Sequence, residues 1–161
     1  MTARVRIGHG FDVHRLVPGR ALVLGGVAIK SDLGLAGHSD GDCVIHAVCD
    51  AILGALALGD MGHHFSSADA AWKDAHSSLF LSAVAAMVVD AGYSLANLDV
   101  TVVAEAPRLA PHVGKMRVSL ARTLGVSADL VSVKAKSTDG LGAIGRGEGI
   151  AAQAVVLLEQ D

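Results

Sequence analysis

Two residues near the start of the chain have the types and the spacing that bind a divalent metal ion. Asp12 and His14 lie two positions apart, at the end of a segment that we predict to be a β-strand from about Arg4 to Val13. A strand turns residues i and i+2 to the same face, so one carboxylate oxygen and one imidazole nitrogen can converge above it. This pair is an incomplete metal site, and another part of the chain must supply a third ligand.

His46 is the best third ligand because it lies on a predicted helix, beside the apolar stripe of that helix. Asp42, His46 and Asp50 are spaced i, i+4 and i+8, so they form a polar stripe along the border of a buried face. Together with Asp12 and His14, His46 would leave an open coordination position, which is the catalytic pattern for zinc or a similar ion. Asp50 could orient an imidazole from behind. Each of these residues by itself also fits an ordinary surface or border position.

Three further segments are weaker candidates for chemistry. The adjacent pair His63-His64 fits a solvated role better than a metal site. Ser137–Gly140 follows a predicted strand and carries two hydroxyls and a carboxylate, which suit phosphate and metal contacts but also an ordinary polar turn. Gly145–Gly149 has glycine at every second position, which predicts a closely packed strand with Arg146 and Glu148 together on its other face, as an ion pair or an anion contact.

The elements that must position these residues follow from periodicity and from the residues that start and stop helices. In chain order we expect a strand over 4–13, a hairpin over 22–29 that turns at Gly25-Gly26, a helix over 41–58 capped by Ser39 or Asp40, a helix over 77–91 stopped by Gly92, a strand over 98–104, a helix from Pro111 to its stop at Gly125, and strands over 131–135 and 150–158. This alternation predicts an α/β (α+β) sandwich: a mixed β-sheet with helices packed on one face. The length of 161 residues fits a single domain, 1–161.

The composition indicates which kinds of partner the protein binds. Apolar residues make up 52% and charged residues 18%, which is more apolar than a small domain needs for its own core. The longest apolar stretch, Ala51 to Leu58, is too short to span a membrane, so we expect an oligomer interface to cover the surplus. The net charge of −3 and the absence of a basic cluster argue against nucleic-acid binding.

The two cysteines and the N-terminus predict a cytoplasmic protein. Cys43 and Cys49 lie six positions apart on one predicted helix, a rise of about 9 Å that is too long for a disulfide. We therefore expect both thiols to be reduced and packed. The chain does not open with the charged, apolar and small-residue pattern of a signal peptide.

Taken together, these segments resemble the 2-C-methyl-D-erythritol 2,4-cyclodiphosphate synthase family. The matching stretches occur in the family's order over nearly the whole chain: 6–14, 38–42 with His46 and Asp50, 58–62, 106–108, 134–139 and 145–151. The resemblance implies a lyase of the non-mevalonate isoprenoid pathway. The 2-phosphate of 4-diphosphocytidyl-2-C-methyl-D-erythritol 2-phosphate would attack the β-phosphorus, CMP would leave, and a cyclic diphosphate would form.

The resemblance also implies a role for each matching residue. Asp12, His14 and His46 would bind Zn²⁺ or a similar ion, and Asp139 a second ion, Mg²⁺ or Mn²⁺. His38 and Ser137 would be catalytic, through transition-state stabilisation. The substrate-binding residues would be Asp12, His14, His38, Ser39, Asp60, Met61, Gly62, Phe65, Asp69, Ala104, Pro107, Arg108, Leu109, Ala110, Ala135, Lys136, Ser137, Thr138, Asp139, Ala143 and Arg146. The family is a homotrimer with active sites between subunits, and Arg146 and Glu148 would lie near its three-fold axis.

The chain departs from the family pattern at a few of these positions. The loop that often reads Phe-Pro-Asp-Thr-Asp is Phe65–Asp69 here, without the proline and one carboxylate. Asp139 stands where Glu is frequent, Ser137 where Thr is frequent, and Ala143 where an aromatic residue can occur. Two alternatives to the synthase are a metal-dependent phosphohydrolase, whose open site would activate water, and a non-catalytic trimeric protein that binds a metal or a nucleotide.

Overall fold

A computed structural model, which describes residues 4–160, contains a five-stranded mixed sheet in the order β4-β1-β7-β5-β6 and a separate two-stranded hairpin. Only β5 and β6 run parallel; the other neighbours in the sheet are antiparallel. The strands are β1 (Val5–Pro18), β2 (Leu22–Leu24), β3 (Val27–Ile29), β4 (Leu33–Leu35), β5 (Tyr93–Val103), β6 (Val131–Lys136) and β7 (Gly149–Gln160). The helices are α1 (Cys43–Ala55), α2 (Met61–His64), α3 (Ser77–Asp90), α4 (Val113–Leu124) and α5 (Gly142–Gly145), with short 3₁₀ turns η1 (Ala70–Trp72), η2 (Ala110–His112) and η3 (Ala128–Leu130).

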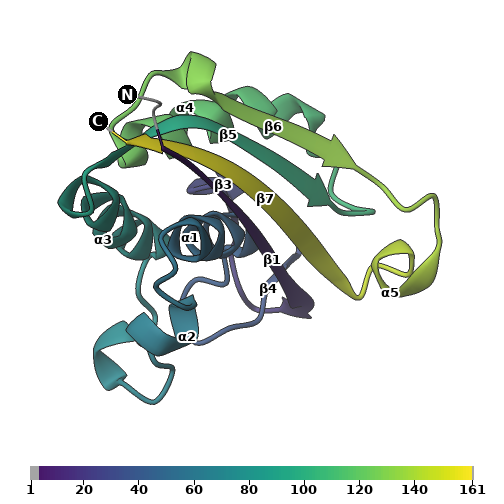
Figure 1. Cartoon of the computed structure of the whole chain (residues 1–161). Coiled ribbons are helices and arrows are strands. Elements are labelled where there is room, and N and C mark those ends of the chain that lie inside the picture. The colour runs from purple at the N-terminus through teal and green to yellow at the C-terminus, as the bar shows by residue number, and fades with distance from the viewer. Residues whose placement is uncertain (1–3, 161) are drawn as a thin grey trace.

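The long helices cover one face of the sheet, as the sequence predicted. α1 packs on β1 and β7, α3 lies beside α1 and contacts β5, and α4 contacts β6 and α3 (Figure 1). The side chains that β5 and β7 turn to this face, such as Leu98, Val100 and Ala152, are fully buried. The fold is therefore an α+β arrangement whose core lies between one mixed sheet and one helical layer.

Two glycines of β1 allow α1 to lie directly against the backbone of the strand. A Cβ atom at Gly8 would come within 1.8 Å of the Ala51 carbonyl oxygen, and one at Gly10 within 1.9 Å of the Ala47 carbonyl oxygen. No side chain can occupy those positions, so the helix axis lies closer to the strand than any larger residue would permit. This close approach places His46, the neighbour of Ala47, beside the strand that carries Asp12 and His14.

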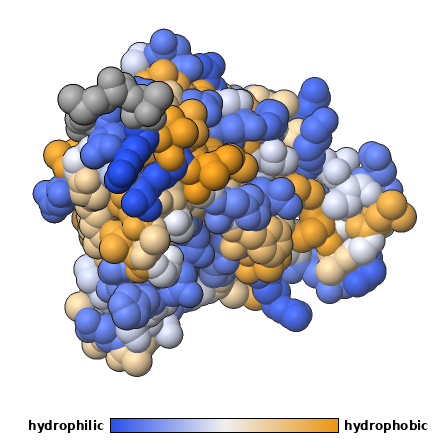
Figure 2. All heavy atoms as spheres, in the orientation of Figure 1, coloured by the Kyte–Doolittle hydropathy of each residue, from blue (hydrophilic) through white to orange (hydrophobic). Residues whose placement is uncertain are grey.

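The opposite face of the sheet is open and largely apolar along β1. Val5, Ile7, Phe11 and Val13 are exposed there, with Ile7 at 72% and Phe11 at 52% exposure, and Val155 of β7 continues the patch. Orange spheres are visible among blue ones in the part of the surface where Figure 1 draws β1 and β7 (Figure 2). Among residues 4–160, no helix combines the length and the apolar character that crossing a membrane requires.

The structure confirms most of the expected elements and corrects several boundaries. The hairpin turns at Gly25 and Gly26, both at positive φ, and Gly125 ends α4 in the left-handed conformation. β1 continues to Pro18 and pairs there with β4, which the sequence did not indicate. The predicted strand through the Gly145–Gly149 segment is wrong: this segment is the end of α5 and a turn, and β7 begins only at Gly149.

The predicted cap of the first long helix is also wrong. Asp42 caps α1, because its carboxylate accepts the Ile45 N–H at 3.0 Å, whereas Ser39 and Asp40 lie in the loop before it. Asp40 instead accepts the Ser77 N–H at 2.9 Å and so stabilises the start of α3. A residue that looks like a local cap in the sequence thus contacts a helix 37 positions further along the chain.

Candidate metal centre and substrate pocket

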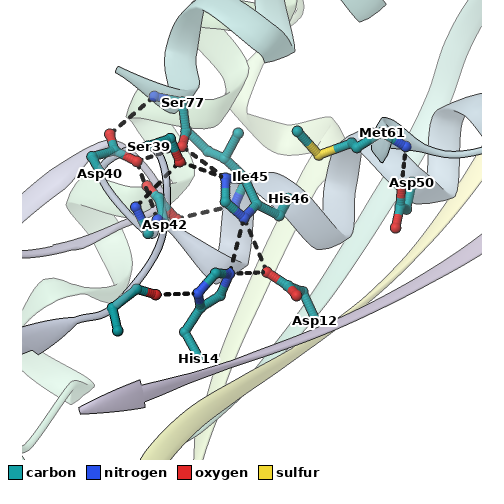
Figure 3. A network of polar contacts seen from close by, with 12 residues as sticks. Asp12, His14, Ser39, Asp40, Asp42, Ile45, His46, Asp50, Met61 and Ser77 are labelled. Atoms are coloured by element: carbon teal, nitrogen blue, oxygen red, sulfur yellow. Dashed lines mark hydrogen bonds and ion pairs between the residues drawn. The ribbon is translucent and has the colours of Figure 1, made fainter. Parts of the chain in front are cut away.

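Asp12, His14 and His46 converge at the edge of the helical layer, as the sequence predicted. The Oδ2 atom of Asp12 lies 2.8 Å from Nε2 of His14 and 3.0 Å from Nδ1 of His46. The two imidazole nitrogens lie 3.2 Å apart, and Figure 3 shows both rings turned toward the carboxylate. Within residues 4–160, this is the one group of histidine, cysteine or acidic residues whose ligand atoms lie close enough together to hold a metal ion.

The far side of each imidazole is held by the fold. Nδ1 of His14 donates to the backbone carbonyl of Ala36, so its Nε2 faces the cluster as an acceptor when the ring is neutral. Nε2 of His46 lies 3.0 Å from the Ser77 hydroxyl and 3.3 Å from the Ser39 hydroxyl, so Nδ1 is the nitrogen that faces the cluster. Two ring nitrogens and a carboxylate oxygen therefore point toward the same position.

The electrostatics of this cluster favour a cation at its centre. Burial acts to raise the pKa of Asp12, but its close contacts with the imidazoles of His14 and His46 outweigh burial and hold the pKa well below its usual range. The hydrogen bond with Asp12 raises the pKa of His14 against the opposing effect of burial. An ionised carboxylate beside two imidazole nitrogens is a donor set that Zn²⁺ accepts, and three protein ligands leave one position open. These residues fit a divalent metal ion.

The cluster opens into a cavity of about 310 Å³ between α1, α2 and the start of α3. The cavity is lined by Asp12, His14, His38, Ser39, His46, Asp50, Met61, Gly62, Phe65, Ser67, Trp72 and Phe80. One wall is aromatic, since the rings of Phe65, Trp72 and Phe80 lie 4.9–5.3 Å apart, centroid to centroid. The cavity thus combines a charged, metal-competent end with an apolar wall.

The loop that carries His38 is held from outside the cavity. The guanidinium of Arg20 donates to the carbonyl of Gly37 at 3.0 Å and to the carbonyl of Ser39 at 2.5 Å, and so it spans His38 on both sides. Arg20 was not among the residues that the sequence suggested, and no local spacing connects it to His38. The two hydrogen bonds to backbone carbonyls hold the 37–39 loop in place beside the cavity.

Two acidic residues of the predicted polar stripe have structural roles instead. The carboxylate of Asp42 is fully buried, where it accepts the backbone N–H groups of Gly25 at 2.9 Å and Gly26 at 2.7 Å in addition to capping α1. Burial raises the pKa of Asp42 to about 6. The prediction that Asp50 orients an imidazole is wrong, because its Oδ1 accepts the Met61 N–H at 2.8 Å and so anchors α2.

A second, smaller hollow of about 210 Å³ lies where β5 and β6 end. It is lined by Ala104, Glu105, Pro107, Arg108, Leu109, Ala110, Ala135, Lys136 and Ser137. In the sheet register Asp12 lies opposite Ala152, Ala152 opposite Val102, and Val102 opposite Ala135. Three strand spacings separate the two ends of this row, about 14 Å. The structure therefore places many of the sequence-predicted residues in two groups at the same end of the sheet, on strands that are three positions apart.

The segment after β6 is exposed at the rim of this second hollow. The Ser137 hydroxyl donates to Oδ1 of Asp139 at 3.2 Å, and Asp139 adopts a positive φ of 52°. Oε2 of Glu105 accepts the N–H groups of Thr138 and Gly140, both at 3.4 Å. Glu105 thus holds the turn that presents Ser137 and Asp139, a role that the sequence did not indicate because the residues are 33 and 35 positions apart.

Several other sequence-predicted residues lie outside both hollows. Asp60 caps α2 and Asp69 caps η1, each through a side-chain oxygen that accepts a backbone N–H. His63 is exposed, and His64 donates from Nε2 to the Leu58 carbonyl at 2.8 Å in an exposed hydrogen bond, in line with the solvated role expected for this pair. Ala143 lies on α5. Arg146 and Glu148 form an ion pair at 2.6 Å, as one of the alternatives predicted.

The cysteines fit the expectation of packed, unpaired thiols. Cys43 and Cys49 are both free and fully buried in α1. Burial raises the pKa of each thiol well above its usual range, so neither is activated as a nucleophile.

The protein is of the α+β class, with one mixed sheet, one helical layer and a His₂Asp cluster that lines a cavity and could hold a metal ion. The sequence profile of the YgbB family matches residues 5–159. A relative from Moorella thermoacetica, named 2-C-methyl-D-erythritol 2,4-cyclodiphosphate synthase, is 60% identical over 154 residues, which cover 96% of this chain and 94% of the relative. The chain therefore belongs to the YgbB family.

Two solved structures are similar along the whole chain. The bifunctional IspDF of Campylobacter jejuni superposes with a TM-score of 0.95 at 39% identity, over 99% of this chain and 43% of that protein. The chain thus corresponds to less than half of the bifunctional enzyme. The IspF of Plasmodium falciparum, solved as a complex with CDP, superposes with a TM-score of 0.88 at 30% identity, over 100% of this chain and 99% of that protein.

Proposed function

We propose that this protein converts 4-diphosphocytidyl-2-C-methyl-D-erythritol 2-phosphate into 2-C-methyl-D-erythritol 2,4-cyclodiphosphate and CMP, a lyase step of the non-mevalonate isoprenoid pathway in the cytoplasm. The observation that carries the proposal is the Asp12, His14 and His46 cluster at the mouth of a cavity. It occurs in a chain that is 60% identical to a protein named as this synthase. The chain also carries a second hollow, at the ends of β5 and β6, that would suit the other end of a nucleotide-linked substrate.

The reaction needs positioning and charge neutralisation rather than a protein nucleophile. An oxygen of the 2-phosphate forms a bond to the β-phosphorus, and the bond from the β-phosphorus to the oxygen of CMP breaks, so that CMP carries away the electron pair. In-line displacements of this kind are accelerated by holding the two phosphates in place and by stabilising their charge. A divalent cation, when bound, supplies Lewis-acid stabilisation of phosphate oxygens.

The metal cavity would receive the phosphorylated methylerythritol end of the substrate. Asp12, His14 and His46 would hold Zn²⁺, and His38 would stabilise the transition state from the loop that Arg20 fixes. Ser39 would contact a phosphate. The remaining contacts would come from Asp60, Met61, Gly62, Phe65 and Asp69, of which Met61, Gly62 and Phe65 line the cavity.

The second hollow would receive the cytidine and the diphosphate. The contributing residues would be Ala104, Pro107, Arg108, Leu109, Ala110, Ala135, Lys136, Thr138, Ala143 and Arg146. Ser137 would stabilise the transition state, and Asp139 would hold Mg²⁺ or Mn²⁺, which would neutralise charge on the diphosphate. The side chain of Asp139 is exposed and aimed by a turn, which leaves its oxygens accessible to an ion.

The chain would act as a single domain, 1–161, in a homotrimer with active sites between subunits. Two features support this assembly. The open face of the sheet exposes Ile7, Phe11 and other apolar side chains that water solvates poorly. The two hollows are also separate within one chain, so a neighbouring copy could bring a second hollow to each metal cavity. Arg146 and Glu148 would then lie near the three-fold axis.

Product analysis tests the proposed function directly. Purified protein with Zn²⁺ and Mg²⁺ is mixed with the diphosphocytidyl substrate and followed by phosphorus-31 NMR. We expect stoichiometric CMP and the cyclic diphosphate, and no turnover after chelation of the metal. Linear products that contain oxygen-18 from labelled water would show a phosphohydrolase instead. Binding of CDP in calorimetry without any turnover would show a non-catalytic nucleotide-binding protein.

A further inference from the structure

The hydroxyl of Ser77 connects the metal cluster to a carboxylate that does not touch the cluster. Ser77 Oγ lies 3.0 Å from Nε2 of His46 and donates a hydrogen bond to Oδ1 of Asp40. The backbone N–H of Ser77 also donates to Oδ2 of Asp40, at 2.9 Å. Ser77 is completely buried although it is polar, and Figure 3 shows it between the His46 ring and Asp40.

The direction of the hydrogen bonds that join Asp40, Ser77 and His46 is determined by which groups can donate and which can only accept. An ionised carboxylate only accepts, so the single hydroxyl proton of Ser77 is directed to Asp40. The oxygen of Ser77 is then left as an acceptor toward His46, and Nε2 of His46 must carry a proton. A neutral imidazole carries one proton, so Nδ1 of His46 keeps its lone pair. That lone pair faces the position between the ligands, 3.2 Å from Nε2 of His14 and 3.0 Å from Oδ2 of Asp12.

The second hydroxyl near His46 does not have this constraint. Ser39 Oγ lies 3.3 Å from Nε2 of His46 and accepts the Gly41 N–H at 3.3 Å, but no carboxylate takes its proton. Ser39 can therefore either donate or accept, and it lines the cavity where a substrate phosphate would bind. The two serines at the same nitrogen thus differ: the hydrogen bonds of Ser77 determine the proton position, and those of Ser39 do not.

We propose that Ser77 and Asp40 are positioning residues for the metal ligand His46, holding its ring in the tautomer with the proton on Nε2 and the Nδ1 lone pair free for the metal. The inference rests on the metal site of the proposed function. Groups that stand behind a metal-binding histidine fix its orientation and tautomer, and their loss typically lowers metal affinity about 10- to 100-fold.

The test separates this role from the support that Asp40 gives to α3. In Ser77→Ala the backbone N–H at position 77 still donates to Asp40, so the start of α3 keeps its hydrogen bond while the hydroxyl is lost. Nitrogen-15 NMR of histidine-labelled, metal-free protein reports the tautomer of His46, and competition with a chelating dye gives the Zn²⁺ affinity. Ser77→Thr restores a hydroxyl, and Ser39→Ala removes the other hydroxyl at the same nitrogen.

We expect the wild type and Ser39→Ala to show the Nε2–H tautomer, and Ser77→Ala to show a mixture with Zn²⁺ affinity lowered about 10- to 100-fold. Ser77→Thr should largely restore the Nε2–H tautomer and the Zn²⁺ affinity. Wild-type tautomer and Zn²⁺ affinity in Ser77→Ala, even with a lower unfolding free energy, would overturn the proposal and leave the synthase activity standing. Failure of the wild type itself to bind Zn²⁺ or release CMP would instead overturn the proposed function, while the tautomer remains measurable.

Discussion

The metal cavity and the hollow at the ends of β5 and β6 lie at the same end of one sheet, but they are built differently. In the cavity, Asp12 and His14 come from a long strand and His46 from a helix pressed against it, and each imidazole is held by a buried or half-buried partner. In the second hollow, Ser137 and Asp139 are exposed on a turn that contacts Glu105 only through bonds of 3.4–3.5 Å. One site is preorganised within the chain by rigid elements, and the other is held within the chain by few and exposed hydrogen bonds.

This difference predicts where substitutions have their largest effects. Changes at the metal cavity should remove both metal and activity, because rigid elements supply ligands that nothing else can replace. Changes at the second hollow should weaken substrate binding more than they affect the metal, because its residues act through few and exposed contacts.

The largest effect is expected from His46→Ala. Loss of one of three ligands should abolish tight Zn²⁺ binding and lower kcat by about a thousandfold or more, since the charge stabilisation at the phosphates is lost. Elemental analysis of dialysed protein and the CMP-release assay measure the two effects. His63→Ala is the matched control, because His63 is exposed on α2 and lies outside the cavity. Unchanged metal stoichiometry in His46→Ala would contradict the three-residue site.

Gly10→Ala should affect the metal cavity through the fold. A Cβ atom there would meet the Ala47 carbonyl oxygen at 1.9 Å, so α1 must move away from β1 and carry His46 with it. We expect a loss of about 3 kcal/mol in the free energy of unfolding, together with weaker Zn²⁺ binding. Urea unfolding measures the former.

The control for this variant is Gly54→Ala in α1, the helix that Gly10 contacts, because a Cβ atom at Gly54 would meet nothing within 4 Å. It should leave the metal site unchanged and stabilise the protein by about 0.5–1 kcal/mol. Equal stability of Gly10→Ala and the wild type would show that the close approach of α1 to β1 does not position His46.

Glu105→Ala tests the second region. The turn that presents Ser137 and Asp139 loses its acceptor, and each lost hydrogen bond is worth about 1 kcal/mol, so KM should rise about tenfold. Zn²⁺ content should stay at the wild-type value, because Glu105 is outside the metal cavity. Steady-state kinetics measures KM, and elemental analysis measures the Zn²⁺ content. Asp129→Ala, which removes another exposed carboxylate, is the control. Loss of Zn²⁺ from Glu105→Ala would mean that the two regions are not independent.

The smallest effect is expected from pH on the metal-free protein. The hydrogen bond with Asp12 raises the folded-state pKa of His14 above its ordinary value of 6.5. Its contribution to stability is therefore fully present below about pH 6.5 and is lost as the pH rises through the folded-state pKa. Asp12 has a lowered pKa, so its own contribution is present above about pH 4 and is lost only in strong acid.

Urea unfolding of chelator-treated protein at about pH 6 and about pH 9 measures the change. His14→Gln removes the titrating group and should flatten the dependence across this range. An equal slope in the wild type and in His14→Gln would show that the pair between Asp12 and His14 does not form without metal.

Much of the metal site was predictable because its geometry is local. Alternation along one strand brings Asp12 and His14 to one face, and the border position of His46 on a helix makes it the natural third ligand. The residue that caps each helix was harder to predict from the sequence. Asp42 competes with Ser39 and Asp40 as a cap of the same helix, and only the buried N–H groups of the hairpin turn, from Gly25 and Gly26, decide in favour of Asp42.

By itself, the sequence determined the types of the ligands, the one-sided packing of helices on a mixed sheet and the family to which the chain belongs. These depend on residue spacing and on motifs, which are properties of short segments. The tertiary structure alone decided that Ser77 rather than Asp50 stands behind His46, that Asp40 stabilises α3, and that Glu105 holds the 137–140 turn. Each of these contacts joins segments more than 30 positions apart. Such contacts arise from how α3 and β5 pack against the rest of the fold, which no local pattern of residues encodes.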